Sequence, residues 1–108
     1  MLVVSSLEAA RAALREGARS LRSPAYAACH AGVNYWWKVL EALRAEFADV
    51  DFTFALCCGE DAAIAHDALR MGFARVICDC GPGQFAELEV MARMLGAQVM
   101  RPARVACG

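Results

Sequence analysis

Short apolar runs alternate with longer stretches of helical periodicity along the chain. An apolar run of about four to eight residues between turn residues is typical of a buried strand, whereas apolar residues at i, i+3, i+4 and i+7 indicate an amphipathic helix. The clearest helix runs from Val33 to Phe47, where a wide apolar stripe faces one way. The pattern predicts strands at residues 2–4, 18–21, 51–58, 75–80 and 97–101, and helices at residues 7–16, 33–47, 60–71 and 82–95.

The spacing of the last three strands predicts a parallel sheet. They begin near Asp51, Arg75 and Ala97, which leaves enough chain between them for a helical crossover. Because the strands are nearly continuous apolar runs, we expect helices on both faces of the sheet. The prediction is an α/β fold with a three-layer, doubly wound, mainly parallel sheet of four or five strands in flavodoxin-like order. The alternative is a partial βα-barrel completed by oligomerisation, since its repeating units look alike locally.

The length and apolar content predict one domain that self-associates. A chain of 108 residues suffices for one hydrophobic core, which we assign to residues 1–102, with residues 103–108 as a loose C-terminal tail. Hydrophobic residues make up 59 % of the chain, above the roughly 45–50 % of ordinary globular proteins. A body this small cannot easily bury so much apolar surface, so a homo-oligomer is expected.

Charge and cysteine usage narrow the function classes. Eleven basic residues against 12 acidic ones give a net charge of −1, without the basic surface that nucleic acids or anionic membranes attract. The N-terminus lacks the features of a secretory signal, and no apolar run reaches the roughly 18 residues of a membrane span. We therefore expect a cytoplasmic protein whose six cysteines are reduced thiols.

The carboxyl ends of the predicted strands are where a ligand is expected. Helix N-termini point toward that edge of an open parallel sheet, and the strand order reverses there. Free backbone N–H groups at the glycines could hold a small anionic molecule, although no phosphate-loop or dinucleotide motif is present. The ligand-binding candidates at this edge are Ser5, Ser6, Cys58, Gly59, Asp79, Gly81 and Gly83.

Cysteines gather at the same edge and suggest a metal site. Side chains alternate along a strand, so Cys78 and Cys80 share a face and Cys57 and Cys58 lie on opposite faces. Cys58, Cys78 and Cys80, completed by His30 or Cys29, would satisfy the tetrahedral preference of zinc. The simpler interpretation is that these cysteines pack as small apolar residues.

A nucleophilic site is a second interpretation of the same residues. Cys58 would lie at a helix N-terminus, whose dipole lowers a thiol pKa, with His30 as the base and Asp79 orienting it. Nothing in the spacing requires the three side chains to meet.

Three consecutive aromatic residues predict an interface. Tyr35, Trp36 and Trp37 cannot all face the core, because successive helical residues diverge by about 100°. One tryptophan is expected in the core and the other at its edge, and we assign the group to a homo-oligomer contact.

The sequence thus favours a small ligand-binding or interaction module with its pocket at the carboxyl edge of the sheet. The alternative is a thiol- or metal-dependent small enzyme that uses the cysteine cluster. No cofactor is indicated, and whether the chain is an enzyme stays open.

Overall fold

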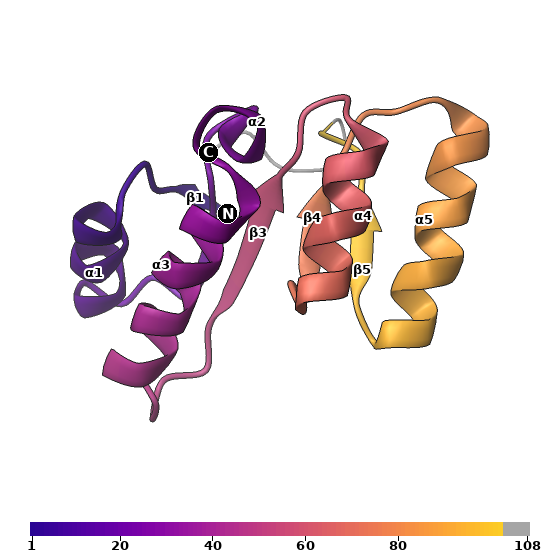
Figure 1. The fold of residues 1–108 in the computed structure, drawn as a ribbon. Coiled ribbons are helices and arrows are strands. Elements are labelled where there is room, and N and C mark those ends of the chain that lie inside the picture. Colours follow the sequence, from indigo (N-terminus) through magenta and orange to yellow (C-terminus); the bar gives the residue numbers. More distant parts are fainter. Residues whose placement is uncertain (103–108) are drawn as a thin grey trace.

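The strands form one parallel sheet in consecutive order (Figure 1). A computed structural model describes residues 1–102, and each strand in it pairs in parallel with the next. The predicted α/β fold with a mainly parallel sheet is confirmed. The strands are β1 (Leu2–Val3), β2 (Ser20–Arg22), β3 (Thr53–Cys57), β4 (Arg75–Ile77) and β5 (Gln98–Met100), and the helices are α1 (Leu7–Arg15), α2 (Ala27–Ala31), α3 (Val33–Glu46), α4 (Ala62–Met71) and α5 (Pro82–Leu95).

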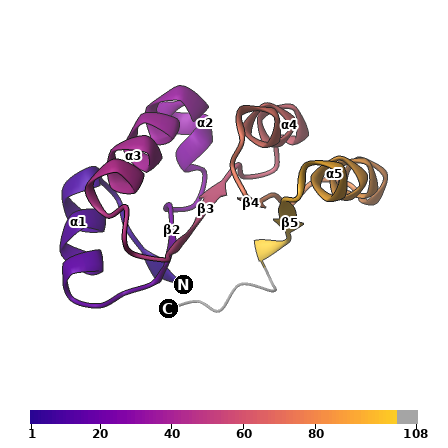
Figure 2. The ribbon, with the colours of Figure 1, turned by 90° about the horizontal axis from the view of Figure 1, so that it is seen from below.

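The helices lie on one face of the sheet (Figure 2). Crossovers between parallel strands are right-handed, so a chain that always moves on in the same direction places each helix on the same side. Helices on the second face require a reversal of strand order, as in flavodoxin-like sheets, and the order β1 to β5 contains none. The flavodoxin-like order and the third layer are therefore corrected to a consecutive order and two layers. This local arrangement is the one expected of a βα-barrel segment.

The core lies between the sheet and the helices. Leu21, Leu56 and Val76 project from the sheet into this layer, where they belong to one cluster with helix residues such as Leu43 and Leu69. The opposite face of the sheet carries a separate small cluster of Ala55, Cys57 and Ile77, against which Met1 and Met100 pack. No residue of α1 to α5 belongs to this second cluster, so we call this side the helix-free face.

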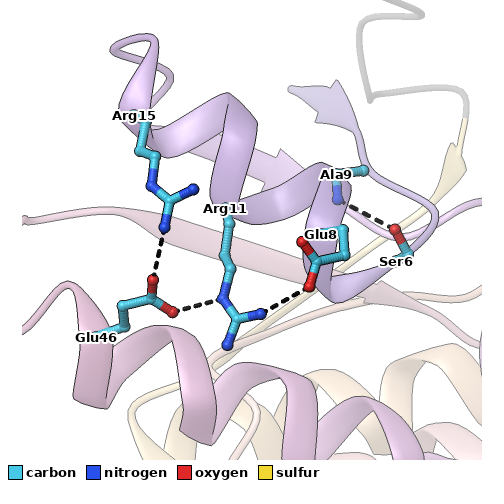
Figure 3. Close-up of polar contacts among 6 residues, drawn as sticks. All are labelled: Ser6, Glu8, Ala9, Arg11, Arg15 and Glu46. Carbon is cyan, nitrogen blue, oxygen red and sulfur yellow. Dashed lines mark hydrogen bonds and ion pairs between the residues drawn. The ribbon is translucent and has the colours of Figure 1, made fainter.

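An exposed network of ion pairs ties α1 to α3 (Figure 3). Both arginines of α1 reach Glu46 at the end of α3, with Arg11 Nε 2.6 Å and Arg15 Nη2 3.0 Å from its carboxylate oxygens. Arg11 also contacts Glu8 at 2.8 Å. The bond to Arg11 and the positive charges hold the pKa of Glu46 below its usual value.

Three further points bear on the predictions. The segment between the predicted strand at 18–21 and the predicted helix at 33–47, where no element was predicted, contains the short helix α2. Within residues 1–102, no helix is long and apolar enough to cross a membrane. The predicted loose tail, residues 103–108, lies outside the described residues.

Candidate functional site

The carboxyl edge of the described sheet has no reversal of strand order, which is the feature on which the predicted pocket depends. Ligands bind at such an edge where the strand order reverses, and the five described strands run consecutively. Ser5, Gly81 and Gly83 are exposed, whereas Cys58 and Gly59 are buried. Ser6 caps α1, and its Oγ accepts a hydrogen bond from the backbone N–H of Ala9 at 3.1 Å (Figure 3).

Tyr26 closes the edge beyond β3. Gly59 has a φ of +61°, and a Cβ built there would lie 2.4 Å from Cδ1 of the Tyr26 ring. Tyr26 is itself left-handed, with a φ of +60°, and its hydroxyl donates to Glu60 at 3.2 Å. The negative charge of Glu60 raises the pKa of Tyr26. The glycine predicted to bind a ligand therefore makes room for an aromatic ring of the same chain.

Arg101 closes the edge beyond β4. Its Nη1 lies 3.2 Å from Asp79 Oδ1 and donates to the carbonyl oxygen of Cys80 at 2.8 Å. Its guanidinium also sits over the Phe85 ring, 4.2 Å from the centroid. Asp79 is thus engaged with an arginine and does not orient a histidine.

A shallow acidic groove remains between these two closures. It is lined by Tyr26, Cys29, Glu60, Asp61 and Gln84, among others. Asp61 is occupied as the cap of α4, where its Oδ1 accepts from the N–H groups of Ala63 and Ile64. The carboxylates of the groove repel an anion, so this edge does not fit the small anionic ligand considered for it.

The cysteines lie on the predicted faces of the sheet, but they do not have the predicted reactivity. Cys58, Cys78 and Cys80 belong to the helix-side core, and Cys57 lies in the opposite cluster. Burial raises the pKa of Cys58 well above the usual range and raises that of Cys78 to about 12. Desolvation outweighs the helix dipole that we expected to lower the pKa of Cys58, so both residues stay thiols at neutral pH.

The predicted metal and nucleophile sites are not assembled in the described part of the chain. Residues 1–102 contain no group of three or more histidine, cysteine, aspartate or glutamate side chains placed to hold a metal ion. His30 is exposed and stacks on Tyr26 at 6.4 Å between ring centroids. No hydrogen bond among these residues joins His30 to Cys58 or Asp79.

The predicted aromatic interface is largely part of the fold. Trp36 is buried, donates from Nε1 to the carbonyl oxygen of Ala27 at 3.3 Å and stacks on Phe54. Trp37 is half-buried, with its edge against Phe73 at 5.2 Å. One tryptophan is therefore in the core and the other at its edge, as predicted. Trp36 cannot reach a partner, and of the three aromatic residues only Tyr35 is well exposed.

Ser23 is a structural residue that the sequence analysis missed. It is fully buried at the end of β2, where its Oγ accepts from the N–H of Cys57 at 2.9 Å and donates to the carbonyl oxygen of Pro24 at 3.2 Å. Its own N–H donates to the carbonyl oxygen of Ala55. Ser23 thus joins β2 to β3 where the ladder between these strands ends.

The helix-free face carries a row of residues that sequence reasoning also missed. The pairing places Arg22 beside Ala55 and Ala55 beside Arg75, so the small side chain lies between two arginines. Both arginines are half-buried, and Arg22 Nε donates to the carbonyl oxygen of Ser23 at 3.2 Å. The full row is Val3, Arg22, Ala55, Arg75 and Gln98.

The residues on both sides of this row complete the face. Ser20 and Thr53 form the row on the amino side, with their hydroxyl oxygens 3.4 Å apart. Cys57, Ile77 and Met100 form the row on the carboxyl side. The face therefore changes from polar to cationic to apolar along the strand direction.

Comparison of the chain with protein-family models, with curated proteins and with solved structures finds no match. Within residues 1–102, the arginine row places two half-buried arginine side chains on the side of the sheet that no helix covers.

Proposed function

We propose that the protein is a binding module that holds a small anionic molecule on the helix-free face of its sheet. The observation that carries this proposal is the row in which Ala55 separates Arg22 from Arg75. Neighbouring strands lie about 4.8 Å apart, so the two arginine backbones are about 10 Å apart. Ala55 itself is fully buried in the small cluster against which Met1 and Met100 pack, so a ligand would contact the two half-buried arginines on either side of it.

The charge of this face fits an anion. Two arginines, Arg22 and Arg75, lie on it, and none of its described strand residues is acidic. A guanidinium binds carboxylate or phosphate oxygens with two parallel hydrogen bonds, which suits either group. The described strand residues of this face are Val3, Ser20, Arg22, Thr53, Ala55, Cys57, Arg75, Ile77, Gln98 and Met100.

The neighbouring rows indicate the rest of the ligand. The half-buried Met100 presents apolar surface on one side of the arginines, and the half-buried Ser20 and Thr53 present hydroxyl groups on the other. A molecule with carboxylate or phosphate groups and an apolar part would match this order of surfaces. Parallel sheets are almost always covered on both faces, which also favours an occupant here.

Binding accounts for the described residues better than catalysis. Cys58 and Cys78 are buried and protonated, and the edge of the sheet offers no connected acid and base. The cysteines of residues 1–102 are free thiols, which suits the reducing cytoplasm. We therefore propose a cytoplasmic binding module and assign it no reaction.

Calorimetric titration of the full chain with citrate and with inorganic phosphate tests the proposal. The variants are Arg22→Gln and Arg75→Gln, and the control is Arg70→Gln, which removes the same charge from the exposed side of α4. A hydrogen bond to a charged group contributes about 1.5–3 kcal/mol, so each test variant should lower the affinity roughly tenfold or more. The control should bind as the wild type does.

The two probes separate the sources of the anionic group. Binding of citrate alone indicates a carboxylate ligand, and binding of phosphate alone indicates a phosphorylated one. If neither anion binds at about 10 mM, or if Arg70→Gln weakens binding as much as the test variants do, the proposal is wrong.

A further inference from the structure

Helix α5 carries apolar residues on two opposite sides. Leu88 and Ala92 are buried against the rest of the protein. Successive residues of a helix turn by about 100°, so Ala86, Val90 and Met94 lie on the side opposite to these two. Val90 is 50 % exposed and Met94 is 82 % exposed, and both Ala86 and Gly83 on the same line are also exposed. We call Gly83, Ala86, Val90 and Met94 the outer line of α5.

The other long helices differ from α5 in this respect. A helix at the surface of a monomer normally presents polar residues to solvent, and one that is apolar all round is normally buried. Helices α1, α3 and α4 follow this rule, since charged or polar residues dominate their exposed positions. These residues are Glu8 and Arg15 on α1, Asn34, Lys38, Glu41, Arg44 and Glu46 on α3, and His66, Asp67 and Arg70 on α4.

We infer that the outer line of α5 packs against the same line of a second copy of this chain, with the two helices antiparallel. A two-fold axis at Val90 brings this residue against its own copy. It also brings Ala86 of each protomer to the level of the partner's Met94, so that a small side chain leaves room for a large one. Such a self-complementary patch is what a two-fold interface requires.

The charges beside the outer line support this occupant. Glu89 and Arg93 lie one turn apart on the same flank of α5, and both are exposed. In the antiparallel pair, Glu89 of each protomer lies near the partner's Arg93, which gives two symmetric pairs of opposite charge. An anionic lipid surface would instead meet Glu87 and Glu89 around the apolar line.

This contact involves a different surface from the arginine row. The outer line belongs to the helix layer, and Arg22 and Arg75 project from the other side of the sheet. The dimer and the anion site can therefore be tested, and can fail, separately.

Sedimentation velocity of the full chain over a range of concentrations tests the inference. We expect a reversible equilibrium between the 11.6 kDa monomer and a species of twice that mass. Val90→Glu and Met94→Glu should each weaken the dimer about tenfold or more, because they bury a charge in the apolar seam. Ala45→Glu, at an exposed position of α3, is the matched control and should leave the equilibrium unchanged. Circular dichroism checks that each variant is folded.

A charge exchange tests the antiparallel arrangement. Glu89→Arg alone should weaken the dimer, since it sets two arginines beside each other in both pairs. The double variant Glu89→Arg with Arg93→Glu should restore the wild-type equilibrium, because both pairs are again of opposite charge. The inference is overturned if the chain stays monomeric up to about 0.5 mM. A dimer insensitive to both substitutions of the outer line, or a double variant as weak as the single one, also overturns it.

Discussion

Ser23→Ala should destabilise the protein through one hydrogen bond at the junction of β2 and β3. In the wild type, the fully buried Ser23 Oγ accepts from the N–H of Cys57 at 2.9 Å. Cys57 is itself 2 % exposed, so the substitution leaves its N–H without that partner in a place that water hardly reaches. The carbonyl oxygen of Pro24 also loses its donor, the Ser23 hydroxyl, which lies 3.2 Å away in the wild type.

The magnitude follows from the cost of an unpaired buried group. Leaving a buried donor unsatisfied costs about 1–3 kcal/mol, and the methyl group of alanine recovers little of it. We therefore expect the free energy of unfolding to fall by about 1–3 kcal/mol, out of a total of about 5–15 kcal/mol for an ordinary domain. For a domain of this size, each kcal/mol lowers Tm by roughly 4–8 °C.

Urea unfolding followed by tryptophan fluorescence measures this change, since the buried Trp36 should respond to loss of the core. Ser5→Ala is the control, because Ser5 is an exposed serine. It should shift the free energy by less than about 0.5 kcal/mol. If Ser23→Ala lowers stability no more than the control does, the bridging role of Ser23 is refuted.

Three further predictions address the closed edge, the thiols and the ion pairs. Gly59→Ala should lower the free energy of unfolding by about 2 kcal/mol or more, because it puts a side chain on a left-handed backbone and against the ring of Tyr26. An unchanged urea midpoint would contradict this prediction. Iodoacetamide labelling at mildly alkaline pH, mapped by mass spectrometry, should modify the exposed Cys29 in the folded protein. The reaction should be slow, because partial desolvation raises the pKa of this thiol. The buried Cys58 should be labelled only after unfolding. Labelling of Cys58 in the folded state would restore the nucleophile hypothesis. The pKa of Glu46 is lowered in the folded state, chiefly by its hydrogen bond to Arg11. The Glu46 carboxylate therefore stabilises the fold fully at pH values above 4.5, the ordinary pKa of the group, and this stabilisation is lost as pH falls through the pKa in the folded state. The stability difference between wild type and Glu46→Gln should therefore shrink on acidification, and a difference independent of pH would count against the ion-pair network.

The position of most elements could be read from periodicity, but their order in the sheet could not. The α3 helix was predicted within one residue, because a long stripe has one consistent period. A βα unit has the same local pattern whether the next strand is added on the same side or on the other. The polar residues Ser20 and Arg22, which alternate with the buried Leu21, were a signal of a half-exposed strand that the prediction of two covered faces overlooked.

The sequence predicted on which face of the sheet each cysteine lies, but it did not predict how reactive the cysteines are. Alternation along the strands correctly separated Cys57 from Cys58. The pKa of Cys58, however, depends on burial by residues far away in the sequence, and this effect outweighs the local helix terminus. The closure of the edge by Tyr26 was hidden for a similar reason, because its contact with Gly59 joins two distant loops.

We propose that the helix-free face binds an anion between Arg22 and Arg75. Titration of the ¹⁵N-labelled chain with citrate and with inorganic phosphate, followed by NMR at the arginine Nε–Hε groups and the backbone amides, tests this proposal. We predict saturable shifts of Arg22 and Arg75, with those of the exposed Arg70 unchanged. Amide shifts confined to the glycines of the carboxyl edge, or equal shifts at all arginines, would contradict binding at the helix-free face.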